Sequence, residues 1–149
     1  AGDGHGVRPD GPRPGRGVVV GVRPGHVPPG RGDHGGAEGD RWLRKGMAIY
    51  RAQLPEQILG DGGHFELSPM YHALVLEELL DVWNLAQAAG QELPEFLHEV
   101  QSWQPRLLQM RAWLAAMTPP DGTLAHFNDT TQGQSATTLE LDDYAQRLG

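Results

Sequence analysis

The residues best suited to chemistry lie together in one short stretch of this 149-residue chain, residues 61–72. A glycine-rich turn there leads into a helix start, with Ser68 placed as the N-cap and Pro69 in the first turn. The reactive side chains of the stretch are Tyr71, His64, His72 and Glu66. Because the positive end of a helix dipole favours anionic groups, this position suits a carboxylate ligand or a proton-transferring tyrosine.

Two other interpretations of these residues compete with proton transfer. A tyrosine beside a histidine at a helix start is more often packing with a surface hydrogen bond. Asp61, His64, Glu66 and His72 could also be read as metal ligands. They lack a compact helical ligand spacing such as i, i+4, so we predict no metal site.

The order of residues in this stretch resembles the DGxxxExSPxYH motif of the heparinase II/III and oligo-alginate-lyase group of polysaccharide lyases. The segments that resemble the same family elsewhere are residues 40–43, 76–81, 121–122 and 127–129. The similarity covers residues 40–149. A contiguous motif with fixed Gly, Glu, Ser, Pro, Tyr and His positions is far more specific than a lone GxGxxG.

This resemblance implies a fold and an activity. Members of the family have an N-terminal (α/α) toroid followed by a β-sandwich domain, and they cleave acidic polysaccharides by β-elimination. Tyr71 matches the family's catalytic acid, which in some members is also the base. We predict that His64, Glu66 and His72 bind substrate, although helix geometry turns His72 about 100° from Tyr71, toward the wall of the site. No cofactor is implied.

β-Elimination explains why such a tyrosine is needed. The reaction removes the C5 proton of a uronate and expels the C4 oxygen, while the neighbouring carboxylate must be neutralised. A tyrosine suits the acid role because its neutral form dominates near pH 7. The expected substrate is therefore a uronate-containing polysaccharide, similar to heparin, heparan sulfate or alginate.

The chain also departs from the family pattern. The family's Asn-His segment would fall near Gly17, yet no asparagine precedes Asn84. A further catalytic histidine belongs to the β-sandwich, which we expect only in a longer protein. We therefore expect this chain to be a fragment with little or no activity alone. The resemblance also implies that the intact protein is periplasmic or secreted. The alternative is a non-catalytic helical interaction module.

Composition separates residues 1–39 from the rest. They hold 13 of the 21 glycines and 6 of the 12 prolines, and they contain no Leu, Ile, Met, Phe, Tyr or Trp. Such a segment cannot bury enough surface to offset the entropy of ordering its backbone, so we predict disorder. A genuine flexible tail and a frame-shift artefact of a GC-rich coding region both explain this composition.

Charge and hydropathy exclude some partners. Residues 40–149 carry 7 basic and 15 acidic side chains, a balance of −8, which argues against nucleic acid. The same balance implies that basic groups for a polyanion lie elsewhere, or that the substrate is less charged than heparin. No apolar run is long enough to span a membrane. Without cysteine, disulfides are excluded.

Helical periodicity predicts an all-α domain from residue 40 onward. The expected helices run from near Asp40 to Pro55, from Ser68 to Gly90, from Pro94 to Met117 with a break or kink at Pro105, and over residues 139–148. Phe127, Asn128 and Asp129 fit an Asx turn slightly better than the edge of a cleft. The tryptophans, expected in the core more often than on sugars, are Trp42, Trp83, Trp103 and Trp113.

Overall fold

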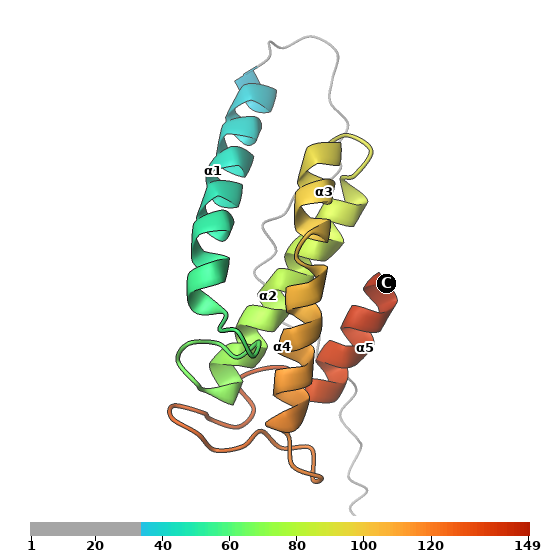
Figure 1. Ribbon diagram of the computed structural model, residues 1–149. Helices are drawn as coiled ribbons and strands as arrows, with labels where there is room; N and C mark the ends of the chain where they lie inside the picture. Colours follow the sequence, from blue (N-terminus) through green and yellow to red (C-terminus); the bar gives the residue numbers. More distant parts are fainter. Residues whose placement is uncertain (1–33) are drawn as a thin grey trace, which may run out of the picture.

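The computed structural model describes residues 34–149 of the chain. Its five helices are α1 (His34–Gln57), α2 (Pro69–Ala88), α3 (Pro94–Gln101), α4 (Gln104–Ala116) and α5 (Thr138–Leu148), shown in Figure 1. Within this part of the chain the β-structure is one isolated bridge between Ile58 and His64. The predicted all-α class is confirmed. The disorder predicted for residues 1–33 falls outside the described residues.

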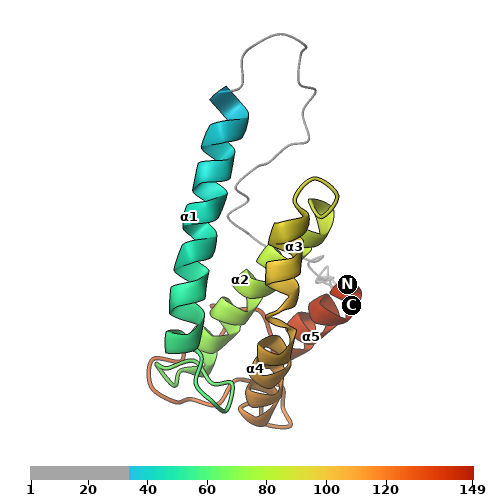
Figure 2. The same cartoon turned by 45° about the horizontal axis from the view of Figure 1, so that its top comes forward.

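The α2 helix is the centre of the bundle. It packs against α3, α4 and α5, and α4 also packs against α5. Figures 1 and 2 show α2 running between α1 on one side and α5 on the other. The buried apolar side chains of α2 recur about every three to four residues: Met70, Ala73, Leu76, Leu79, Leu80, Trp83 and Ala86. Because these apolar residues recur at helical spacing in the sequence, the helix predicted from Ser68 to Gly90 closely matches α2.

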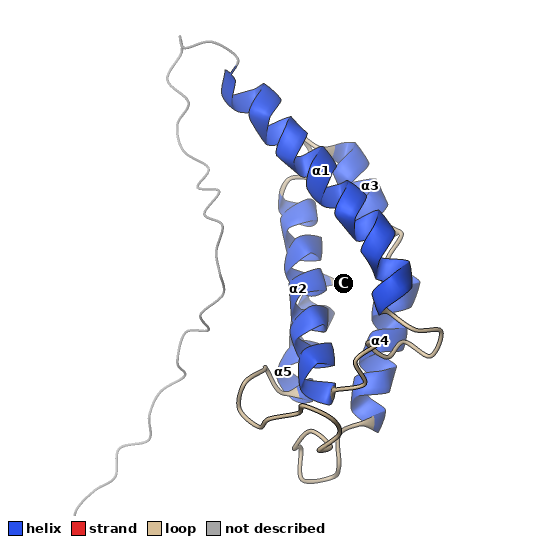
Figure 3. Cartoon of the chain, turned by 90° about the vertical axis from the view of Figure 1, so that its left-hand side faces the viewer, coloured by secondary structure: helices blue, strands red, loops and turns tan. Residues whose placement is uncertain are grey.

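The α1 helix is attached to the bundle mainly through side chains. Figure 3 shows it running obliquely to α2. The Tyr50 hydroxyl donates to Glu78 Oε1 at 2.7 Å, and the Tyr50 ring lies 5.3 Å from that of Trp103. Arg51 forms a bidentate ion pair with Glu99 of α3. Met47 and Leu54, two helical turns apart on this helix, are buried against the bundle.

Both ends of α1 differ from the sequence prediction. The helix begins at His34, so residues 34–39, assigned to the disordered segment, are helical. Glu38 supports this extra turn by pairing with Arg41 at 3.7 Å. The helix also continues past Pro55 to Gln57. A proline this close to the end removes only one backbone donor, and the following residues complete the last turn.

Pro105 separates α3 from α4, as predicted. The chain makes a short turn at Ser102 and Trp103, and Pro105 occupies the first turn of α4, where its missing N–H has no intrahelical partner to lose. Trp83 and Trp103 are buried and Trp113 is half-buried, whereas Trp42 is exposed. The core expectation is therefore wrong for Trp42, which lies on the outer part of α1.

Several large apolar side chains stay on the surface, among them Trp42, Ile49, Leu85 and Leu108. These exposed apolar side chains belong to α1, α2 and α4. None of the helices in residues 34–149 is long and apolar enough to cross a membrane.

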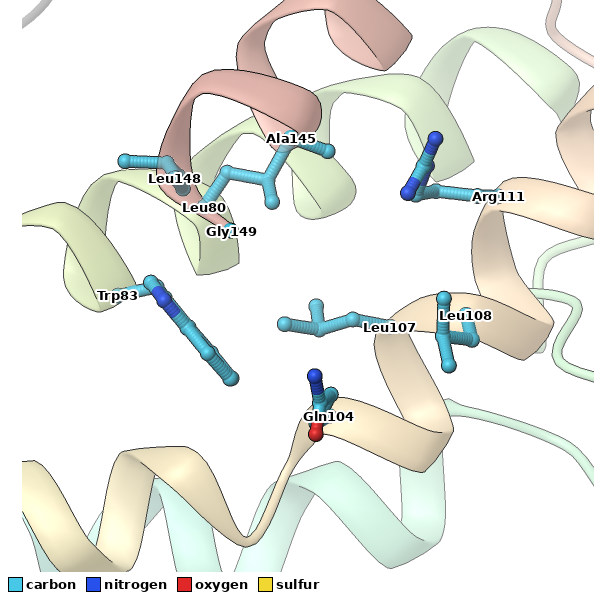
Figure 4. A pocket seen from close by; sticks show the side chains of 9 residues that line it. All are labelled: Leu80, Trp83, Gln104, Leu107, Leu108, Arg111, Ala145, Leu148 and Gly149. Carbon is cyan, nitrogen blue, oxygen red and sulfur yellow. The ribbon is translucent and has the colours of Figure 1, made fainter.

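A small apolar hollow of about 80 Å³ lies between α2, α4 and α5. Figure 4 shows Trp83 and Leu80 facing Leu107 across it. Arg111 at its edge is paired with Asp142, with Nε and Oδ1 2.8 Å apart. Arg111 is the one charged side chain among the lining residues, and this ion pair engages it, so we assign the hollow no reactive role.

Candidate functional site

The loops that precede α2 and α5 meet at one end of the bundle, below α2 and α4 in Figure 1. The first loop, residues 58–68, contains the glycine-rich turn. Gly62 has φ +90, and a Cβ there would lie 2.5 Å from the backbone carbon of Gln109. A Cβ on Gly63 would lie 2.7 Å from Trp113 Nε1. The two glycines therefore let the loop backbone lie directly on α4.

We expect Gly62→Ala to destabilise the chain by at least about 2 kcal/mol. The added methyl group meets backbone atoms that cannot move aside, and alanine is disfavoured at this left-handed conformation. Urea unfolding followed by circular dichroism measures the loss. Gly60→Ala is the matched control, because nothing lies within 4 Å of a Cβ at that position. Equal stability of the two variants would contradict the close packing of the turn.

His72 joins this loop to α4 from inside the bundle. Its side chain is fully buried. Nδ1 accepts the backbone N–H of His64 at 3.1 Å, so Nε2 carries the proton and donates to the Met110 carbonyl at 3.0 Å. Burial lowers the pKa of His72 to about 4. In this structure a neutral ring ties the loop to α4, and the expected direct contact with substrate is not available to it.

His64 lies at the base of the same loop and is also buried, with 4% of its surface exposed. Its ring packs at a tilt against that of Phe65, with 4.7 Å between centroids, and no described residue bonds to its buried Nδ1. Burial lowers the pKa of His64, while the Glu66 carboxylate opposes this shift. Glu66 itself is exposed at the loop surface.

Tyr71 occupies the position that the sequence predicts, in the first turn of α2. The helix begins at Pro69, and the Ser68 side chain accepts the Tyr71 backbone N–H at 3.5 Å. The Tyr71 side chain is 36% exposed. It lines an open groove of about 690 Å³ together with Met70, Leu74, Asn128, Asp129, Thr130, Thr131 and Gln134. The groove leaves the Tyr71 side chain accessible from outside the bundle.

The far side of this groove comes from the second loop, so residues 128 and 129 lie at a cleft edge, the less favoured of the two predictions for segment 127–129. Asn128 does not close an Asx turn on its own backbone. Its Nδ2 donates to the carbonyls of Glu66 and Leu67 at 2.9 and 3.1 Å. The cleft-edge alternative for segment 127–129 anticipated this position, but the sequence gave no indication of which carbonyls Asn128 would bind.

The structure thus separates the predicted residues into two layers. Tyr71 and Glu66 reach the surface, while His64 and His72 lie beneath them in the loop's anchor. Among residues 34–149, no three His, Cys, Asp or Glu side chains come together as metal ligands do. His72 in particular has both ring nitrogens engaged by the backbone.

The residues of this loop and helix match a known family. A family model described as the heparinase II/III N-terminus matches residues 37–148. The chain belongs to the heparinase II/III family. A heparin-sulfate lyase of Pedobacter heparinus is 29% identical over 90 residues, which cover 60% of this chain and 13% of that lyase. A heparin-sulfate lyase of Bacteroides stercoris is 30% identical over 95 residues, covering 62% and 13%.

This heparinase II/III chain therefore spans only a small part of the length of the curated relatives it matches. The matched region contains both loops, the whole of α2 and Tyr71. No solved structure shows a significant match.

Proposed function

We propose that residues 34–149 are part of the helical (α/α) toroid domain of a polysaccharide lyase that cleaves a uronate-containing acidic polysaccharide by β-elimination. One observation carries the proposal: Tyr71, the residue that matches the family's catalytic acid, is partly exposed at an open groove in the first turn of α2. The family membership and the two relatives named heparin-sulfate lyase support it.

In this proposal Tyr71 transfers the proton. Its hydroxyl protonates the C4 oxygen as that oxygen leaves, and it can receive the C5 proton where one group performs both steps. The first-turn N–H groups and the helix dipole stabilise negative charge that develops on the phenol oxygen. Asp129, Thr131 and Gln134 line the groove and offer hydrogen bonds to sugar hydroxyls.

Neutralising the uronate carboxylate requires a further group. The residues that line the Tyr71 groove include no lysine, arginine or histidine. We place the neutralising group and the remaining proton-transfer partner in other parts of the complete lyase, including a C-terminal β-sandwich domain. The same argument predicts that the 149-residue chain alone has no measurable activity. We propose that the lyase is periplasmic or secreted, because uronate-containing polysaccharides are found outside the cytoplasm.

The test is turnover by the full-length gene product on a panel of polymers. Alginate, heparan sulfate and heparin are the uronate substrates, and amylose is the control without a uronate. Each elimination creates a C4–C5 double bond that is followed by ultraviolet absorbance. We expect absorbance to rise on at least one uronate polymer and not on amylose. Failure on every uronate polymer would contradict the lyase proposal and favour a helical interaction module.

A further inference from the structure

The loop before α5 is bonded directly to the loop that positions Tyr71. The Asn128 side-chain amide bridges two successive carbonyls of that loop, those of Glu66 and Leu67. Leu67 has φ 52 and Asn128 has φ 48, so both lie in the left-handed region that residues other than glycine rarely adopt. Such conformations persist when the surrounding contacts hold them, and here these two residues are held against each other.

Thr130 makes a second connection, at the N-cap of α2. Its hydroxyl lies 3.1 Å from Ser68 Oγ, and it also accepts the Met70 backbone N–H at 3.5 Å. Ser68 Oγ in turn accepts the Tyr71 N–H. A continuous hydrogen-bonded path therefore runs from Thr130 through Ser68 to the backbone of Tyr71. Asn128 and Thr130 also line the same groove as the Tyr71 side chain.

We propose that Asn128 and Thr130 are positioning residues for Tyr71, and that residues 128–134 form the second wall of its groove. The inference rests on the proposed proton transfer by Tyr71. The Asn128 amide fixes the entry of the chain into α2, and the Thr130 hydroxyl fixes its first turn. Together they set the direction of the phenol relative to a sugar held against residues 128–134.

Two substitutions separate positioning from general stability. Asn128→Asp keeps the size and the tolerance of a left-handed backbone, but it replaces the donating amide with a carboxylate that faces two carbonyl oxygens. Thr130→Val keeps the shape and removes the hydroxyl. Thr137→Val is the matched control, because Thr137 caps α5 through Glu140 and does not line the groove. It removes a threonine hydroxyl from a helix start away from Tyr71.

Kinetics of the full-length gene product provide the first readout. We expect kcat to fall about ten- to a hundred-fold in Asn128→Asp and Thr130→Val, with KM changed much less, because a small misplacement of the reacting group affects the chemical step. Thr137→Val should lower the melting temperature without changing kcat. If kcat stays at the wild-type value in both loop variants, the positioning role is overturned.

The second readout does not depend on activity. The chain has three tyrosines, so 3-fluorotyrosine labelling gives three ¹⁹F resonances, and Tyr71→Phe identifies the one from Tyr71. In Asn128→Asp and Thr130→Val we expect that resonance to shift or broaden while those of Tyr50 and Tyr144 stay in place. A Tyr71 resonance that is unmoved, or that moves only as it does in Thr137→Val, overturns the proposal.

The two readouts also separate this inference from the proposed function. If the wild-type gene product eliminates no polymer, the lyase proposal fails, and the ¹⁹F spectra still decide whether Asn128 and Thr130 hold Tyr71. If Asn128→Asp moves all three resonances, the chain has lost its fold. In that case Thr130→Val and Asn128→Gly, which keeps the left-handed backbone, decide the outcome by the same two criteria.

Discussion

His72→Ala is expected to destabilise the chain by about 3–5 kcal/mol at pH 7, a large part of the stability of a small domain. The substitution empties a fully buried site beside Trp113, whose ring lies 4.5 Å from that of His72. It also leaves the buried His64 N–H without its acceptor and removes the second hydrogen bond to the Met110 carbonyl. Urea unfolding at pH 7, followed by circular dichroism, measures the loss.

The same residue makes stability depend on pH. The pKa of His72 is about 4 in the folded chain because burial disfavours its charged form, whereas an unfolded histidine titrates near 6.5. With a lowered folded pKa, the stabilisation is complete above about pH 6.5 and is lost as pH falls toward 4. The shift corresponds to roughly 3 kcal/mol. The unfolding free energy of the wild-type chain should therefore decrease across this range.

The variants isolate this contribution from other groups. The lowered carboxyl pKa values of Glu140 and Asp121, and the lowered pKa of His64, also reduce stability in acid, but these groups are present in every variant. His72→Gln, whose amide can replace one of the two hydrogen bonds, should lose less stability than His72→Ala. Both variants lack the titrating ring, so their unfolding free energy should depend less on pH than that of the wild type. His98→Ala, at an exposed position of α3, should match the wild type. An unchanged pH dependence in His72→Gln would contradict a neutral, buried His72.

The helices were largely predictable because the information for them is local. Ser68 and Pro69 define the start of α2, and its apolar periodicity defines the buried faces. The break at Pro105 follows from the chemistry of proline alone. The errors at α1 have local causes as well. One proline near a helix end is tolerated, and the extra turn at the start is supported by Glu38.

The candidate site was less predictable because its bonds join residues far apart in the chain. Asn128 lies about sixty positions after the carbonyls that it bridges, and its expected turn gives no hint of them. His72 was placed correctly on α2, but its burial depends on Met110 of α4. Sequence periodicity gives the face of a helix, whereas the partner on the next helix follows only from the packing.

Tyr71 is the residue on which the proposed activity depends most. It is the exposed first-turn residue of α2 in the open groove, whereas its neighbours Met70 and His72 are buried. Tyr71 and Leu74 both line the groove, one helical turn apart, and a phenylalanine at position 71 keeps the aromatic ring there. Tyr71→Phe therefore removes the transferable proton while leaving the packing in place.

In the full-length gene product we expect Tyr71→Phe to fold normally and to lower kcat by at least about a hundred-fold, the usual scale of general acid–base catalysis. Because the ring remains, KM should change little. A lower kcat at an unchanged KM indicates the loss of an interaction made only in the transition state. Leu74→Ala is the control, since it trims the groove wall and leaves the Tyr71 hydroxyl in place. Glu66→Gln tests the exposed neighbour. If Tyr71→Phe retains near wild-type turnover while Glu66→Gln abolishes it, proton transfer belongs to Glu66, and the tyrosine only shapes the groove.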